Sequence, residues 1–234
     1  MNTYKHAFKK AFPYTLPVFT GYLFIGTAFG VMFAEKGYNV FWATLMSILV
    51  YAGSGQYLAV TFFIPGFSLI QVAFLTFMVN IRHTFYGLSL LKKFENMGKK
   101  YFYMIFSLTD ETYSLLCTVK TPPDVNEQKF LFAIAFLDHS YWVLGTIIGS
   151  LMGTYLPIDS KGIDFAMTAL FIVIFLDLWT EKAKRTPEYI GIICSVLCLN
   201  IFGPNNFILP AMLCITAILI FGRKHFEVEE APCQ

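Results

Sequence analysis

Charged residues are scarce in this chain, and long stretches contain none. Only 14% of its 234 residues are charged, against roughly 25% in an ordinary soluble domain. Residues 11–34, 40–64 and 189–222 contain no Asp, Glu, Lys or Arg. A water-soluble fold needs charged side chains over its surface, so the shortage indicates that much of the chain lies in lipid.

Missing motifs exclude several function classes. There is no G-x-x-x-x-G-K-[ST] loop, so a solute transporter of this sequence would not hydrolyse ATP. A membrane hydrolase would have only Asp110-Glu111 and Asp138-His139 as candidate catalytic groups. The chain has no H-E-x-x-H motif, no nucleophile elbow and no residues with the spacing of metal ligands. A net charge of +2 without a basic stripe gives no argument for nucleic acid. We therefore expect no enzyme, no cofactor and no nucleic-acid partner.

Apolar sequence is abundant, at 56% hydrophobic and 18% aromatic residues. A bilayer core about 30 Å thick needs about 20 helical residues to cross it. Backbone amides in lipid must be paired internally, and no stretch alternates like a barrel strand, so helices are favoured. The sequence predicts one transmembrane domain, 1–234, an all-α polytopic bundle of about seven or eight apolar segments. These are expected at 13–34, 40–64, 67–91, 101–119, 130–156, 163–180, 188–203 and 206–222.

The distribution of lysines conflicts with eight full crossings. With the N-terminus in the cytoplasm, ten Lys and Arg residues fall inside and six outside, four of these six in the loop 92–100. Cytoplasmic loops normally carry the excess of positive charge. Either the rule fails at this loop, or a neighbouring segment enters the membrane and returns. Ala52–Gly55 and the acidic pair Asp110-Glu111 are the two places where a helix would break.

A faint internal repeat joins the two halves of the chain. Tyr22, Gly26, Thr27 and Gly30 recur 119 residues later as Tyr141, Gly145, Thr146 and Gly149. This predicts structural repeats at about 13–100 and 130–222, an architecture of many secondary transporters. Eight full spans would make the repeat parallel, and one re-entrant segment between the halves would make it inverted. The glycines, with Gly153, also have the four-residue spacing of closely packed membrane helices.

Several ionisable side chains lie within apolar segments, where each charge costs about 2.5–3.5 kcal/mol on insertion scales. Arg82 needs a carboxylate or water, because its guanidinium does not deprotonate. The candidate partners are Asp110, Glu111 and Asp138. These groups either surround a hydrated cavity that binds a zwitterionic or ionic solute and relays protons, or form a structural ion pair or reach the interface.

Two stretches are typical of broken helices, residues 52–56 and 200–206. Free N–H groups at the start of a half-helix attract a carboxylate, and free carbonyls attract an ammonium, so an amino acid would suit such a site. The alternatives are tight packing at the glycines and an ordinary turn. The predicted substrate-binding residues are Gly53, Ser54, Gly55, Gln56, Asn80, Arg82 and His83. The predicted proton-coupling residues are Asp110, Glu111, Asp138 and His139.

The same residues carry a resemblance to a known family. In order along the chain they are Gly26-Thr-Ala-Phe-Gly30, Ala52-Gly53-Ser54-x-Gln56, Arg82-His83 with Tyr86-Gly87, Asp110-Glu111, Trp142 with Gly145 and Gly149, and Gly162-Ile-Asp-Phe165. This series resembles the AzlC family of branched-chain amino acid permeases over nearly the whole chain. The resemblance implies export of Leu, Ile, Val and in some members Met. It also implies a small hydrophobic partner subunit of the AzlD type.

The sequence therefore predicts a multi-pass transporter of the cytoplasmic membrane that exports branched-chain amino acids, with coupling to protons. Hypothetically, the 53–56 backbone and Arg82 hold the substrate carboxylate, while Asp110 or Glu111 holds the ammonium or relays the proton. A passive channel and a structural subunit of a larger transporter are the alternatives. Residue types do not fix the direction of transport, the coupling ion or the exact substrate.

Overall fold

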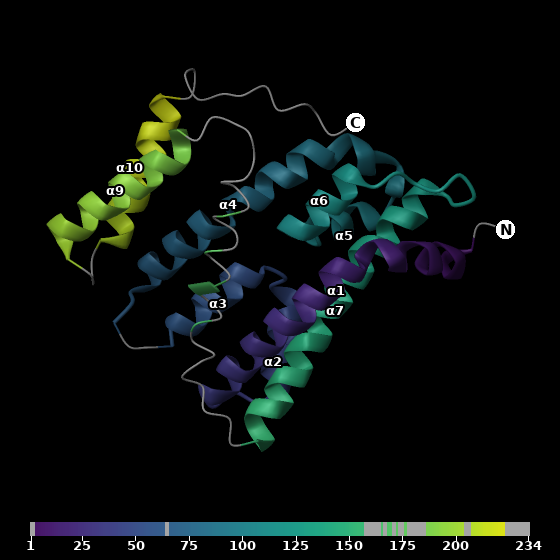
Figure 1. The fold of residues 1–234 in the computed structure, drawn as a ribbon, viewed down its shortest axis with the longest axis horizontal. Helices are drawn as coiled ribbons and strands as arrows, with labels where there is room; N and C mark the ends of the chain where they lie inside the picture. The colour runs from purple at the N-terminus through teal and green to yellow at the C-terminus, as the bar shows by residue number, and fades with distance from the viewer. Residues whose placement is uncertain are drawn as a thin grey trace. The chain divides into compact units, whose positions relative to one another are not determined.

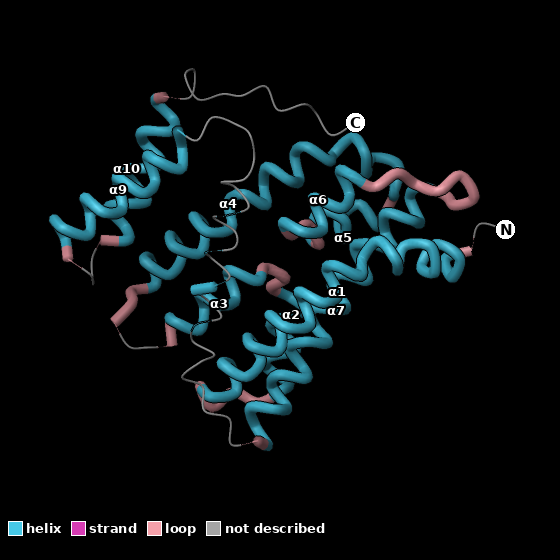
Figure 2. Tube along the Cα trace, viewed as in Figure 1, coloured by secondary structure: helices cyan, strands magenta, loops and turns pink. Residues whose placement is uncertain are grey.

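The computed structural model describes residues 3–63, 66–156, 186–203 and 207–222, with isolated positions between 157 and 185. All regular elements in these residues are helical (Figure 2), which confirms the predicted all-α fold. They belong to two compact units, Met1–Leu170 with the last three residues and Phe171–Ala231. Each unit is described by itself.

Two long helices, α1 (Tyr4–Glu35) and α7 (Glu127–Tyr155), lie side by side and run in the same direction (Figure 1). Their 32 and 29 residues correspond to about 48 and 44 Å of helix. In the part of the chain that the structure describes, these two helices are long and apolar enough to cross a bilayer.

Glycines bring the backbones of α1 and α7 into direct contact. A Cβ atom on Gly145 would lie 2.8 Å from the carbonyl oxygen of Tyr22, and one on Gly26 would lie 3.1 Å from that of Trp142. A Cβ on Gly149 would overlap the backbone of Thr27. The helices therefore touch along a seam that only glycine permits, as small-x-x-x-small spacing predicts.

Between these helices the chain forms two helical hairpins. The first contains α2 (Val40–Leu49) and α3 (Gly53–Thr61), joined by a tip at residues 50–52. Both of its ends lie at the C-terminal end of α1, where the rings of Phe33, Tyr38 and Phe63 pack together with centroids 4.7–5.7 Å apart. The chain thus enters the bundle along α2 and returns along α3.

The helix α4 (Leu69–Phe94) then runs to the end where α1 begins. The capping box between Ser68 and Gln71 fixes its start. It is followed by η1 (Glu95–Met97) and by the second hairpin, which contains α5 (Lys100–Phe106) and α6 (Asp110–Thr118), joined by a tip at residues 107–109.

Both ends of the second hairpin lie beside the start of α1. Lys100 contacts Tyr4 at one end. In the loop that follows α6, Asp124 pairs with Lys10 at 3.0 Å and His6 at 2.9 Å. Hydrogen bonds from these two side chains lower the pKa of the Asp124 carboxyl to about 2. The second hairpin therefore enters from the end opposite to the first.

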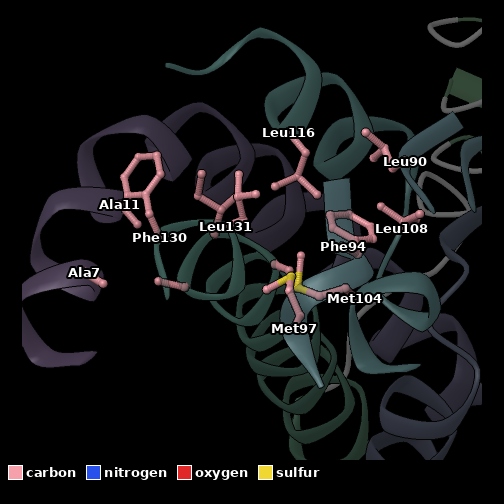
Figure 3. Close-up of a cluster of buried hydrophobic side chains, with 13 residues drawn as sticks. Ala7, Ala11, Leu90, Phe94, Met97, Met104, Leu108, Leu116, Phe130 and Leu131 are labelled. Carbon is pink, nitrogen blue, oxygen red and sulfur yellow. The ribbon is translucent and has the colours of Figure 1, made fainter. Parts of the chain in front are cut away.

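An apolar cluster holds the second hairpin in place (Figure 3). It joins the start of α1 and of α7 to the end of α4 and to both arms of the hairpin. Its largest fully buried members include Phe94, Leu116 and Phe130. Burying a side chain of this size contributes about 1.5–3 kcal/mol if the surface leaves water.

The hairpins show how the chain breaks within two of the expected apolar segments. Segments 40–64 and 101–119 do not run straight through, because each is two helices of 7–10 residues, about 10–15 Å long. Both expected break points are real. The reversals leave one end of the bundle, which we call the lysine end, with nine lysines: Lys5, Lys9, Lys10, Lys92, Lys93, Lys99, Lys100, Lys120 and Lys129.

Two reversals also explain why α1 and α7 are parallel. Residues that the predicted repeat pairs lie opposite each other along the two helices, with Gly26 against Gly145 and Gly30 against Gly149. The parallel orientation is the one expected for an even number of reversals between the halves. The repeat itself stays a prediction.

The second unit contains α9 (Thr186–Phe202) and α10 (Ile208–Phe221), which pack against each other. Cys194, Cys198 and Ala211 are buried there. The helix α9 continues through Asn200, so the proposed break at 200–206 begins only at Gly203, where φ is +74°. Residues 204–206, and most of the expected segment 163–180, lie outside the described residues.

A buried polar network fastens the first hairpin to α7. Gln56 accepts a hydrogen bond from Trp142 Nε1 at 2.6 Å and donates one to Ser47 at 3.1 Å. Ser47 in turn donates to Thr146 at 2.9 Å. The Gln56 side chain is fully buried, and both polar atoms of its amide have a partner, as buried polar groups usually do.

We expect Gly149→Ala to destabilise the protein, because its Cβ meets backbone of α1 that cannot move aside. Gly21→Ala in α1 is the matched control, because a Cβ there meets nothing within 4 Å. Thermal unfolding in detergent should show a lower Tm for Gly149→Ala and an unchanged or higher Tm for Gly21→Ala. Equal stability of both variants would refute the close seam.

We expect Gln56→Leu to lower stability by about 1–3 kcal/mol, since it leaves the buried Trp142 Nε1 without an acceptor and removes the donor to Ser47. Transport by the folded fraction should keep its substrate KM. An altered KM with unchanged unfolding would instead assign Gln56 to the substrate.

Candidate functional site

The tips of the two hairpins meet beside the middle of α1 and α7. Tyr51, in the first tip, stacks on His139 with ring centroids 4.3 Å apart and packs edge-on against Tyr22 at 6.3 Å. Thr109, in the second tip, shares a 2.6 Å hydrogen bond with the Tyr22 hydroxyl. Tyr22 therefore contacts both tips, and the region around it is called the centre below.

Arg82 of α4 joins the two hairpins at the centre. Its Nη1 lies 3.0 Å from Asp110 Oδ2, at the start of α6, and its Nη2 donates to Ser54 Oγ at 2.8 Å, at the start of α3. The Tyr86 hydroxyl donates to the other Asp110 oxygen at 2.6 Å. Of the three carboxylates predicted as partners, Asp110 is the one that pairs with Arg82.

The Arg82–Asp110 pair is only half-buried. The two side chains are 27% and 31% exposed, so a solute that reaches the centre meets charged groups already in place. Arg82 Nε and Asn80 Oδ1 are buried and find no partner among the described residues. Unsatisfied buried polar atoms are costly, and they identify the places where a bound solute or water adds hydrogen bonds.

Two half-helices begin at the centre. The helix α3 starts at Gly53 and α6 starts at Asp110. The first N–H groups of a helix lack partners within it and carry partial positive charge. In α6, Asp110 and Glu111 supply acidic groups to the first turn and Thr109 caps the backbone of Thr112. In α3 the first turn has no acidic residue, so its N–H groups remain suited to an outside carboxylate.

The glycines at the start of α3 are required by close contacts. A Cβ on Gly55 would lie 2.8 Å from the Asn80 amide nitrogen, and one on Gly53 would lie 3.0 Å from the Trp142 ring. The structure thus gives these glycines a packing role, and it places Gln56 in the structural network with Trp142 and Ser47. Ser54 is the member of this turn whose side chain contacts Arg82.

Glu111 lies next to the ion pair and is exposed. It accepts a 2.7 Å hydrogen bond from the Tyr22 hydroxyl. His83, on α4, is half-buried and packs against Tyr86 with ring centroids 5.9 Å apart. Both predicted residues therefore border the same centre as Arg82.

Asp138 is fully buried on α7, and its Oδ2 accepts a 2.9 Å hydrogen bond from Thr112. Its other oxygen has no partner among the described residues. Next to it, His139 contacts the Ser47 carbonyl through Nε2 at 3.3 Å and the Tyr103 hydroxyl through Nδ1 at 3.1 Å. A neutral imidazole that donates through Nε2 and accepts through Nδ1 satisfies both contacts.

Sequence reasoning missed several hydroxyl groups at the centre, namely Tyr22, Ser47, Tyr86, Tyr103, Thr109 and Thr112. Hydroxyl side chains are common in membrane helices and cost little there, so none stands out in the sequence. Two of them did have a sequence signal, Tyr22 from its place in the predicted repeat and Tyr86 from its place in the family resemblance. Among the described residues, no group of His, Cys, Asp and Glu has the arrangement of a metal site.

Comparison with known proteins shows which family this chain belongs to. The AzlC protein family matches residues 17–156. The branched-chain amino acid transport protein AzlC of Bacillus subtilis is 42% identical over 96% of this chain and 88% of its own length. An uncharacterized membrane protein of Helicobacter pylori strain J99 is 39% identical over 97% of this chain and its full length.

A more distant relative is the inner membrane protein YgaZ of Escherichia coli, 27% identical over 88% of this chain and 87% of its own length. No solved structure matches the chain. The family match covers both hairpins and the α1–α7 seam, so it includes all the residues of the centre. This chain is a membrane protein and belongs to the AzlC family of transport proteins.

Proposed function

We propose that this protein exports branched-chain amino acids across the cytoplasmic membrane, coupled to protons. The name of the Bacillus subtilis relative supports the substrate class. The observation that carries the proposal is the position of Arg82, which joins the start of α3 to the start of α6. The centre therefore offers both signs of charge to a zwitterion within one partly exposed site.

Binding would proceed by an exchange of ionic partners. The substrate carboxylate takes the place of Asp110 on Arg82 and accepts hydrogen bonds from the start of α3. Asp110 is then free to accept the substrate ammonium together with Glu111. Each charge keeps a partner throughout, so the exchange avoids leaving a bare charge in a poorly hydrated site.

The pocket for the side chain must be apolar, because Leu, Ile and Val differ only in hydrocarbon. Such pockets separate substrates that differ by one methylene by about 1–3 kcal/mol. We therefore propose overlapping transport of Leu, Ile and Val, with Met as a further substrate of similar size.

The lysine distribution supports an orientation. Placing the lysine end in the cytoplasm satisfies the positive-inside rule for the loop 92–100, which eight straight spans would violate. Within the first unit, α1, α4 and α7 then cross the membrane. The first hairpin enters the membrane from outside and the second from the cytoplasm, so the centre lies between two hairpins that enter from opposite sides.

A small AzlD-type subunit is the proposed partner, as the family resemblance implies. The helix α4 has large apolar side chains that are exposed in the isolated chain, including Leu69, Ile70 and Phe85. Lipid or a hydrophobic subunit covers such a surface. Transport should therefore be measured with and without co-expression of the neighbouring small membrane protein.

We expect cells preloaded with Leu-, Ile- and Val-containing dipeptides to release these amino acids faster when they express the protein. Arg82→Gln and Glu111→Gln should each slow the release by roughly tenfold or more, since the first leaves Asp110 without its cation and the second removes an acid that would accept the substrate ammonium. The measurement is the efflux rate at equal amounts of protein in the membrane. An uncoupler of the proton gradient should abolish the accelerated efflux.

The matched controls are Lys36→Gln and Glu127→Gln, which remove exposed charges away from the centre. They should transport at the wild-type rate. Normal efflux by both centre variants would overturn the site, and efflux that ignores the uncoupler would favour a passive channel.

Single cysteines in a cysteine-free background would test the hairpins. We expect Tyr38→Cys and Phe67→Cys, which flank the first hairpin, to react with an impermeant thiol reagent from one side of the membrane. Lys99→Cys and Asp124→Cys, which flank the second, should react from the other side. Labelling of Tyr38→Cys and Phe67→Cys from opposite sides would show that α2 and α3 form a crossing.

A further inference from the structure

A continuous line of oxygen atoms connects Glu111 to Asp138. Glu111 Oε2 lies 2.7 Å from the Tyr22 hydroxyl, which lies 2.6 Å from Thr109 Oγ1. Thr109 Oγ1 lies 3.1 Å from Thr112 Oγ1, which lies 2.9 Å from Asp138 Oδ2. All four contacts are within hydrogen-bond distance. We call these five side chains the hydroxyl relay.

Counting hydrogens shows that the relay contains a proton from a carboxyl group. Four oxygen–oxygen contacts need four hydrogens, and the three hydroxyls of Tyr22, Thr109 and Thr112 supply one each. If both acids are ionised, one contact is between two oxygen atoms with no hydrogen between them. If both are protonated, there is one hydrogen too many for the line. All four contacts are satisfied when one of the two acids carries a proton.

The charges around the relay also indicate that one of the two acids is protonated. The centre holds three carboxyl groups, Asp110, Glu111 and Asp138, while Arg82 is paired with Asp110. The other titratable groups that pack there are His83, His139, Tyr51, Tyr86 and Tyr103. The His139 contacts are satisfied by its neutral form. Asp138 is fully buried, and among the described residues of the centre no cation is left to balance the charges of Asp138 and Glu111. One shared proton reduces these two negative charges to one.

We propose that Glu111 and Asp138 share one exchangeable proton. It passes between them through the hydroxyls of Tyr22, Thr109 and Thr112. In one state the carboxyl hydrogen is on Glu111 and Asp138 is ionised, and in the other state the two roles are reversed. The five side chains keep the same positions in both states, and only the direction of the four hydrogen bonds changes.

The transfer conserves protons at every oxygen. Starting with protonated Asp138, its hydrogen moves to Thr112, whose own hydrogen moves to Thr109. The Thr109 hydrogen moves to Tyr22, and the Tyr22 hydrogen moves to Glu111. Each hydroxyl gains one hydrogen and loses one, so Asp138 ends ionised and Glu111 ends protonated, with no other reactant.

The relay gives the second hairpin a role in coupling, and this step rests on the proposed transport. Glu111 is exposed and Asp138 is fully buried, so the relay extends from an accessible acid to an enclosed one. Thr109 and Thr112 belong to the second hairpin, whereas Tyr22 is on α1. Movement of the hairpin away from α1 and α7 would break its contacts with Tyr22 and Asp138 and would leave the proton on one acid.

The first test counts protons and does not depend on transport. An infrared spectrum of the purified protein at neutral pH should contain the carbonyl stretch of one protonated acid from this pair. Glu111→Gln and Asp138→Asn should each remove that band completely, because the new amide supplies the missing hydrogen and the remaining acid ionises. Glu127→Gln should leave it unchanged.

Three other spectra would overturn the proposal. If each substitution removed half of the band, both acids would be protonated independently. If one substitution removed the band and the other had no effect, one acid alone would hold the proton. Absence of the band in the wild type would mean that both acids are ionised, which also contradicts the relay.

The second test separates proton movement from substrate movement in proteoliposomes. Thr112→Val should keep leucine–leucine exchange, which needs no net proton transfer, and Tyr22→Phe removes a second hydroxyl of the relay. Leucine-driven proton flux, followed by an internal pH dye, should fall by roughly a hundredfold. Thr112→Ser should restore it, since it restores the hydroxyl.

Tyr14→Phe and Thr118→Val are the controls, because both side chains are exposed on the same helices as Tyr22 and Thr112. Wild-type proton flux in Tyr22→Phe or Thr112→Val would overturn the relay. Failure of the wild type itself to exchange leucine would contradict the proposed substrate, while the infrared result would still decide the shared proton.

Discussion

The arrangement of this molecule depends on one constraint, that a helix interrupted inside an apolar bundle must satisfy its backbone ends within the protein. At the first tip, the carbonyl of Ser47 near the end of α2 meets His139, and the amide of Ala52 turns back to Val50 at 2.7 Å. At the second tip, Thr109 caps α6. Two of the groups that pair with these backbone ends, His139 and Thr109, lie where the tips meet. The centre is polar because the two helices break there.

The two hairpins and the pair α1–α7 are held by different forces, and this difference is suited to a transporter. The helices α1 and α7 touch backbone to backbone at Gly26 and Gly145, which leaves no room for sliding. The hairpin tips are attached through side-chain hydrogen bonds and one half-buried ion pair, Arg82–Asp110. Interactions of this kind exchange partners at small cost when water or a solute enters. A rigid pair of helices beside two tips whose polar contacts can exchange is suited to alternating access.

Part of this arrangement follows from sequence alone, and the rest depends on tertiary contacts. The cost of a buried guanidinium predicted an acidic partner for Arg82, and glycine and polar residues predicted breaks near residues 52 and 110. The reversal of the chain at those breaks was left open, because a broken helix and a hairpin have the same local sequence. Gln56 was predicted to bind substrate, yet both ends of its amide are engaged by Trp142 and Ser47. Hydroxyls such as Tyr22 were missed because their significance lies in what they contact.

The central claim is that the substrate binds where the two tips meet, and cross-linking with a diazirine analogue of leucine tests it most directly. In proteoliposomes, light should attach the analogue to peptides that contain residues 50–56, 82–86 or 107–112, and excess leucine should prevent the labelling. Arg82→Gln should lose the label at these peptides. Leucine-sensitive labelling confined to other parts of the chain, and unchanged in Arg82→Gln, would place the substrate elsewhere and contradict the account.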